Sequence, residues 1–195
     1  MGKRKPSKGS TSKTPHLRVM EPVLQDLKRL IGERGAGGRG KQAALDEAQE
    51  LIYAAWETGN RARRVALAKK ALQISPDCAD AYVLLAEEEA RFDVAAAHDL
   101  YAQGVAAGER ALGKRAFQKE EGYFWGILET RPYMRARAGL AACLWQIGER
   151  EGAVSHYRDM LRLNPNDNQG IRYVLATQAT SDRLSGPAGQ KESSP

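Results

Sequence analysis

The sequence predicts an all-α protein, a solenoid of about three helical-hairpin repeats that ends in a single capping helix. Three observations predict this fold. Between residues 41 and 180, Ala, Leu, Glu, Arg and Gln dominate and runs of β-branched residues are absent, which is typical of helices. Glycine and proline interrupt this helical region at intervals. In two separate segments the distance from a glycine to the next helix-ending proline is the same, which indicates an internal repeat.

The composition is that of an ordinary globular protein and excludes several other classes. The 195 residues are 42% hydrophobic and 28% charged, and no apolar run approaches the roughly 20 residues that span a bilayer. The basic first residues, Met1 to Lys8, lack the apolar stretch of a secretory signal. Only two cysteines, Cys78 and Cys143, are present, so a disulfide scaffold is excluded and a reduced, cytoplasmic location is expected.

The two ends of the chain are predicted to be disordered, and the first of them is basic. Residues 1–40 carry a net charge of +7, whereas residues 41–195 carry −1. Within this arm we expect one short amphipathic helix at 20–34 and a glycine-rich linker at 35–40. The arm either only solubilises the chain or attracts RNA or DNA by counterion release. Residues 181–195, rich in Ser, Gly and Pro, are expected to be a disordered tail.

The glycine-rich linker nearly matches a phosphate-binding loop. Residues 35–41 hold the glycines and the lysine of the GxxxxGK pattern, but Gln42 stands where that loop needs Ser or Thr to hold Mg²⁺. The preceding residues 25–33 predict a charged helix, whereas the motif requires a buried strand. We therefore expect no nucleotide or other cofactor, and interpret the stretch as a flexible linker or as an RG-type contact with RNA.

The repeat shows in two segments that end at proline. Gly59 lies seventeen residues before Pro76, and Gly148 lies seventeen residues before Pro165. The residue before a proline avoids the α conformation, so each proline ends a helix, while each glycine separates the two helices of a hairpin. This pattern resembles the tetratricopeptide repeat (TPR), a helical hairpin of about 34 residues. The resemblance implies a TPR-like domain over residues 41–180.

A middle repeat begins near Ala79 and is less regular. Tyr82 and Leu85 match the first helix of the TPR family, and Tyr101 matches the second if the turn between them is one residue short. A single helix over residues 168–178 is expected to cap the stack. Its apolar positions are Ile171, Val174 and Leu175.

A narrower resemblance appears at the start of this middle repeat. The segment Pro76–Ala90, PDCADAYVLLAEEEA, together with Ala106–Glu109 downstream, is similar to the suppressor-of-tumorigenicity-seven family, whose helical-repeat core carries a very similar string. The animal members of that family are membrane proteins, whereas this chain shows no spanning segment. The resemblance therefore implies the helical-repeat fold alone.

An insertion separates the middle repeat from the last one. The two helix-ending prolines are 89 residues apart, which exceeds two repeats by about 21 residues, and we place the excess at residues 107–130. This insertion contains three consecutive aromatic residues between glycines, Tyr123, Phe124 and Trp125. Either they fill the gap between repeats or they form part of a binding surface.

No catalytic or metal-binding pattern is present, so we expect neither enzyme activity nor a metal site. Cys78 and Cys143 lie 65 residues apart, and no CxxC or HxxxH spacing occurs. Glu87 to Glu89 are consecutive helix positions, which point about 100° apart and therefore do not converge as a catalytic pair. We interpret them as an exposed acidic rim.

The TPR resemblance implies that the first helix of each hairpin lines a concave face, and we predict partner-binding residues there. Trp56 and Trp145 share one offset in the repeat, and either form a paired aromatic platform or pack between helices. Trp, Tyr and Arg are frequent anchors of interfaces, and the groove would suit a short peptide with an apolar residue and a carboxylate. The predicted residues are Tyr53, Trp56, Arg135, Trp145 and Arg172.

Together these features favour a non-enzymatic protein–protein interaction scaffold that binds a peptide or helix of a partner protein on the concave face of a TPR-like array. The alternative is a nucleic-acid-associated adaptor that is tethered through its basic residues 1–40. No membrane partner is expected.

Overall fold

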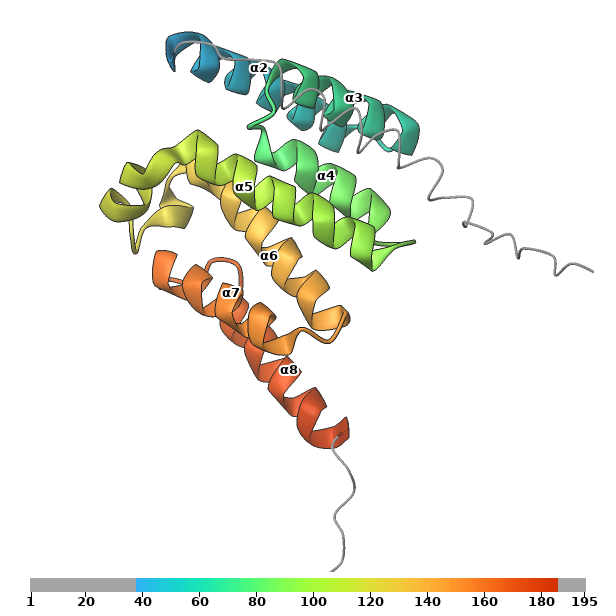
Figure 1. Cartoon of the computed structure of the whole chain (residues 1–195), viewed down its shortest axis with the longest axis vertical. Helices are drawn as coiled ribbons and strands as arrows, with labels where there is room; N and C mark the ends of the chain where they lie inside the picture. Colours follow the sequence, from blue (N-terminus) through green and yellow to red (C-terminus); the bar gives the residue numbers. More distant parts are fainter. Residues whose placement is uncertain (1–37, 186–195) are drawn as a thin grey trace, which may run out of the picture. The chain divides into compact units, whose positions relative to one another are not determined.

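The computed structural model describes residues 38–185, which belong to one compact unit of the chain. The described part consists of α-helices and two short 3₁₀ helices without any strand, which confirms the predicted all-α class (Figure 1). The elements, labelled as in Figure 1, are α2 (Gly38–Glu57), α3 (Arg61–Ile74), α4 (Ala79–Glu89), α5 (Val94–Lys119), η1 (Phe124–Gly126), η2 (Leu128–Thr130), α6 (Arg131–Gln146), α7 (Arg150–Leu163) and α8 (Ile171–Ser185).

The helices break where the sequence predicted. Between α2 and α3, the Asn60 side chain accepts a hydrogen bond of 3.0 Å from the backbone N–H of Arg63, which caps the start of α3. Gly148, between α6 and α7, has a φ of +92°, a left-handed conformation that glycine adopts without strain. Both α3 and α7 end two residues before a proline, at Pro76 and Pro165.

Consecutive helices pack together in pairs. α2 packs on α3, α4 on α5, and α6 on α7. The first helix of each later pair also contacts both helices of the preceding pair, since α4 contacts α2 and α3, and α6 contacts α4 and α5. Tyr82, Leu85 and Tyr101 of the predicted middle repeat are buried in these contacts. α8 contacts α7 and buries Ile171 against the same core cluster that Val174 and Leu175 touch, as predicted.

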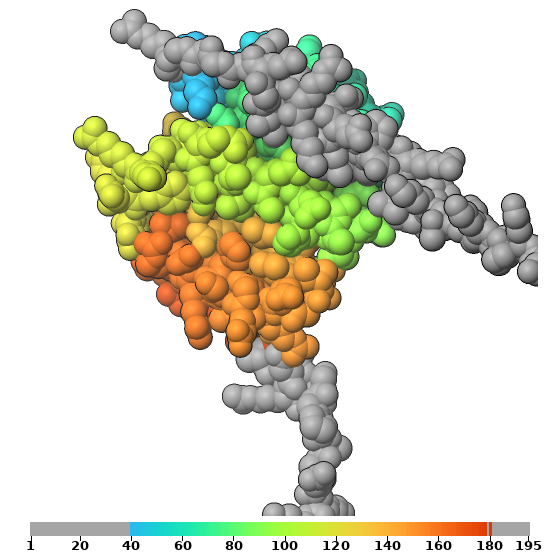
Figure 2. Space-filling model, viewed as in Figure 1, coloured from blue at the N-terminus to red at the C-terminus, as the bar shows by residue number. Residues whose placement is uncertain are grey.

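Residues 107–130, where the sequence predicts an insertion, contain the end of α5 and both 3₁₀ helices. The α5 helix has 26 residues and bends at Gly113, whose φ of +69° is outside the helical region. The chain then passes through η1 and η2 before α6 begins. In Figure 2 the yellow-green end of α5 protrudes at one side of the described unit. The predicted insertion therefore lies beside the helical pairs.

Several boundaries differ from those predicted. The linker expected at 35–40 is helical from Gly38 onward, because the first N–H groups of a helix need no helical partner and glycine costs little there. The capping helix expected at 168–178 is α8, which starts and ends later, so that residues 181–185 of the predicted tail are helical. The arm helix predicted at 20–34 lies outside the described residues, as does the rest of the tail.

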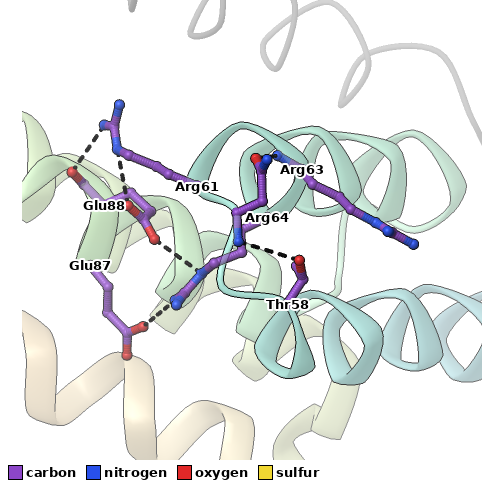
Figure 3. A network of polar contacts seen from close by, with 7 residues as sticks. Thr58, Arg61, Arg63, Arg64, Glu87 and Glu88 are labelled. Carbon is purple, nitrogen blue, oxygen red and sulfur yellow. Dashed lines mark hydrogen bonds and ion pairs between the residues drawn. The ribbon is translucent and has the colours of Figure 1, made fainter.

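A network of ion pairs ties α3 to α4 and corrects the predicted acidic rim (Figure 3). Arg61 donates to the Glu88 carboxylate at 3.0 Å, and the Nε of Arg64 lies 3.0 Å from the other oxygen of that carboxylate. Glu88 is only 5% exposed and Glu89 only 6%, so of the three consecutive acids Glu87 alone is exposed. The α3 arginines cover Glu88, because a carboxylate is buried only where partners compensate its lost hydration.

Candidate functional site

The structure brings three of the five predicted partner-binding residues together. Tyr53 and Trp56 lie on α2 with their ring centroids 6.0 Å apart. The guanidinium carbon of Arg135, on α6, lies 5.3 Å from the centre of the Trp56 ring, a cation–π arrangement. Tyr53 is 48% exposed and Trp56 is half-buried, so this aromatic cluster presents ring surface to solvent.

Arg135 is held in place by a carboxylate that the sequence analysis did not single out. Its Nε donates to Oδ1 of Asp80 at 2.8 Å, and a second guanidinium nitrogen pairs with Oδ2. Asp80, at the start of α4, is fully buried and also accepts a hydrogen bond of 2.9 Å from Gln49 of α2. Three helices, α2, α4 and α6, thus meet at one buried carboxylate, which already balances the charge of Arg135.

Trp145 and Arg172 lie apart from the aromatic cluster, and each has local partners. Trp145 packs partly buried against the core cluster between α6 and α7, 5.2 Å from the guanidinium carbon of Arg150. Arg172 donates to the backbone carbonyl of Pro165 at 3.0 Å and lies 3.6 Å from the carboxylate of Asp167. Trp56 and Trp145 therefore have different cationic partners.

The aromatic residues of the insertion divide between the core and the surface. Phe124 is fully buried, and its ring centroid lies 5.2 Å from that of Phe117 and 6.1 Å from that of Tyr133. Trp125 packs partly buried against the same core cluster. Tyr123 is 61% exposed. Phe124 thus fills a gap between helices, as the first alternative predicted, whereas the alternative of a binding surface stays a prediction for the exposed Tyr123.

A groove of about 300 Å³ adjoins the aromatic cluster at Tyr53, and we call it the α2 groove. It is also lined by Leu128 and Glu129 of η2 and by the first turn of α6. The α2 wall is one face of that helix, because its residues recur every three or four positions. The residues of this wall are Gln42, Leu45, Asp46, Gln49, Glu50 and Tyr53.

The α2 groove combines a buried apolar floor with an acidic rim. Ala79, Gly108 and Tyr133 lie buried beneath it, and Leu128 at its edge is 65% exposed. Four carboxylates line the groove, whereas no lysine or arginine does. The groove therefore offers apolar contact below and negative charge above.

One of these four carboxylates, that of Asp77, is already neutralised. It lies 2.8 Å from Nζ of Lys41 and 2.6 Å from Nε of Arg110. Burial alone would raise the pKa of Asp77, but the hydrogen bonds and charges of these two cations outweigh burial and hold the pKa below its usual 3.8. The negative charge of the groove is thus supplied by the other three, Asp46, Glu50 and Glu129.

The comparison with protein families now decides the relationship that the Pro76–Ala90 segment suggested. The model of the ST7 protein family matches residues 40–174, which include almost all of the described helices. The chain belongs to the ST7 family. The TPR resemblance stays a prediction.

Individual ST7 proteins match over about two thirds of this chain or more. The suppressor of tumorigenicity 7 protein-like of Bos taurus is 32% identical over 151 residues, which are 71% of this chain and 26% of that protein. The protein ST7 homolog of Drosophila melanogaster is 29% identical over 71% of this chain and 28% of its own length. The protein ST7 homolog of Caenorhabditis elegans is 31% identical over 68% of this chain and 27% of its own length. The chain thus spans about a quarter of the length of these relatives. No solved structure matches it significantly.

Within residues 38–185 of this ST7-family chain, no helix is long and apolar enough to cross a membrane. The same residues contain no group of three or more His, Cys, Asp or Glu side chains placed to hold a metal ion. Cys78 and Cys143 are both buried. Burial raises the pKa of the Cys78 thiol to about 12, so this side chain stays protonated and unreactive in the folded chain.

Proposed function

We propose that this ST7-family chain is a non-enzymatic scaffold for protein–protein interaction. In this proposal its helical pairs form a TPR-like solenoid of three hairpins with α8 as the cap. A peptide or helix of a partner protein binds on the face formed by α2, α4 and α6, the first helices of the three pairs.

The pattern of helix contacts carries the proposal. In a solenoid each hairpin contacts only its neighbours, and the first helices line one extended face. Here α4 contacts α2, and α6 contacts α4, so the three first helices touch in series. The buried carboxylate of Asp80 joins side chains from all three of them.

The aromatic cluster is the centre of the proposed binding face. Tyr53 and Trp56 expose ring surface, and aromatic side chains lose little conformational freedom when they bind. The bidentate contact with Asp80 fixes Arg135 against the Trp56 ring. Trp145 and Arg172 have local partners, and we assign them a secondary place on this face.

The nucleic-acid adaptor is the weaker proposal, because the excess of positive charge on which it depends lies outside the described helical part of the chain. The basic residues on which it depends lie mainly in residues 1–37, outside the described part, whereas residues 41–195 carry a net charge of −1. As part of the scaffold proposal, we also propose the cytoplasmic location that the sequence predicts.

Site-specific cross-linking tests the scaffold proposal while the partner is still unidentified. The full chain is expressed in its native cells with a photoreactive phenylalanine analogue in place of Tyr53, or in place of Tyr173 as the control. Tyr173 lies on α8 and is 75% exposed, so both positions are accessible. We expect that at least one protein is cross-linked to the chain through position 53 but not through position 173. Mass spectrometry identifies the cross-linked proteins.

A purified partner then allows the contribution of the aromatic cluster to be measured. Trp56→Ala is expected to weaken binding of the partner about thirtyfold, because truncation of a central aromatic anchor costs about 2 kcal/mol. Circular dichroism and thermal melting establish whether the variant is folded. Equal cross-linking at both positions, or undiminished affinity of a folded Trp56→Ala chain, would contradict the proposal.

A further inference from the structure

We propose that the α2 groove selects a basic peptide segment, one in which an arginine or lysine lies next to an apolar residue. This inference rests on the proposed scaffold function and names the chemical class of the ligand. It differs from the expectation in the sequence analysis, where the predicted arginines favoured a peptide that carries a carboxylate.

The shape of the groove requires an apolar residue in its ligand. Its volume of about 300 Å³ is at the lower end of the range of ligand pockets in proteins. The buried floor offers only the small side chain of Ala79, the backbone of Gly108 and the ring of Tyr133. Leu128 stands 65% exposed at the rim, so contact with an apolar ligand side chain would remove its surface from water.

The charge of the groove requires a cation beside that apolar residue. Glu50 of α2 and Glu129 of η2 both line the groove, so a cation bound in it would be attracted by both carboxylates. Among the described side chains no lysine or arginine forms an ion pair with either of these two carboxylates. The nearby cations, Lys41 and Arg110, are both paired with Asp77.

The end of the groove next to the aromatic cluster disfavours a ligand carboxylate. Arg135 is the cation expected to bind such a group, but Asp80 already takes two of its guanidinium nitrogens. Tyr53, which belongs to both the groove and the cluster, offers a ring face that attracts cations as well. The same carboxylates repel the phosphates of nucleic acids, so a basic protein segment is the occupant that these charges fit.

Three pools of short synthetic peptides test the inference on the full chain. The pools share their apolar residues and carry arginine, glutamine or glutamate at the remaining positions, and binding is followed by fluorescence anisotropy. We expect the arginine pool to bind, the glutamine pool to bind more weakly and the glutamate pool not to bind. Binding of the arginine pool is also expected to weaken as salt is added, because these carboxylates are exposed.

Two double variants of equal net charge assign the binding to the groove. Glu50→Gln with Glu129→Gln removes two carboxylates that line the groove and is expected to weaken binding of the arginine pool about tenfold. Glu47→Gln with Glu57→Gln removes two exposed α2 carboxylates outside the groove and is expected to leave it unchanged. All four side chains are exposed, so both variants should retain the melting temperature of the parent chain.

The outcomes separate this inference from the proposed function. Equal binding of the glutamate and arginine pools, or equal effects of the two double variants, would overturn the inference and leave a peptide-binding scaffold in place. If no pool binds, the inference is wrong, whereas the scaffold proposal is decided by cross-linking at Tyr53. If the groove variants abolish self-association of the chain, the occupant is a second copy and the inference is wrong as well.

Discussion

At the scale of single residues, the burial of Asp80 determines how Arg135 behaves. The carboxylate is 0% exposed, whereas the side chain of Arg135 is 30% exposed. A buried carboxylate that loses its cationic partner keeps the cost of its lost hydration without compensation. Arg135 is therefore needed for stability as well as for the proposed binding face.

Arg135→Met is expected to lower the free energy of unfolding by about 3 kcal/mol, because Asp80 then retains only the hydrogen bond from Gln49. Adding Asp80→Asn to this variant should recover much of the loss, since the uncompensated charge is removed. Urea unfolding followed by circular dichroism measures both effects.

Arg172→Met provides the comparison for this prediction. Arg172 also pairs with a carboxylate, but its side chain is 59% exposed, so we expect a loss of less than about 1 kcal/mol. Similar losses for Arg135→Met and Arg172→Met would show that Asp80 does not depend on its ion pair.

At the scale of elements, glycines allow α5 to approach α6 closely. A Cβ atom added to Gly108 would lie 2.9 Å from Cβ and 3.2 Å from Cα of Tyr133. One added to Gly104 would lie 3.1 Å from Cβ of Ala136. These neighbours are backbone or the first side-chain atom of a helical residue, so they move only if the helix moves. The packing of α5 on α6 therefore depends on the absence of side chains at these positions.

Gly108→Ala is expected to destabilise the chain by about 1–3 kcal/mol, because overpacking against the α6 backbone outweighs the gain in helix propensity of about 1 kcal/mol. Gly152→Ala in α7 is the matched control, since its Cβ would meet only Leu144 at an ordinary 3.6 Å. That control is expected to raise the melting temperature. Thermal unfolding measures both, and a stabilised Gly108→Ala chain would show that α5 and α6 are less closely packed than described.

At the scale of the whole molecule, the described helices form one continuous set of contacts. α4 contacts helices of the preceding and the following pair, and α6 contacts both helices of the preceding pair as well as α7. Cys78, just before α4, and Cys143, within α6, are both buried and free. Their thiols therefore report on unfolding at two places in the same set of contacts.

Both thiols are expected to become reactive together. Burial raises the pKa of each, and that of Cys78 reaches about 12, so neither reacts quickly in the folded chain. If the helices unfold cooperatively, a thiol reagent should label both at the same urea concentration, which should match the midpoint seen by circular dichroism. Mass spectrometry localises the label. Earlier labelling of Cys143 alone would mean that the α6–α8 part unfolds separately.

The sequence predicted the all-α class and the helix breaks, because these depend on local chemistry. Gly59, Pro76, Gly148 and Pro165 act on the backbone around them, and their effect is visible without any tertiary contact. The conformation of residues 107–130 could not be predicted from the sequence in the same way. After the bend at Gly113, Phe124 is buried against Phe117 and Tyr133, and no local pattern indicates these contacts.

The details of the candidate site could be predicted only in part. Tyr53, Trp56 and Arg135 followed from their offsets in the repeat, but Asp80 and Arg135 are 55 residues apart and nothing local links them. The burial of Glu88 was missed for a similar reason, since three consecutive acids look like a solvated surface until the arginines of α3 are placed over them. The periodic face of α2 from Gln42 to Tyr53 was the one local indication of the groove.

The α2 groove is lined by parts of the chain that lie on either side of the α5 bend at Gly113. The α2 wall belongs to the first helical pair, whereas η2 belongs to the predicted insertion. Shortening the segment between residues 113 and 130 would open the groove on one side and leave the contacts among α2, α4 and α6 in place. Homologues that share these helices but diverge in that segment would therefore differ in ligand preference while retaining a common architecture.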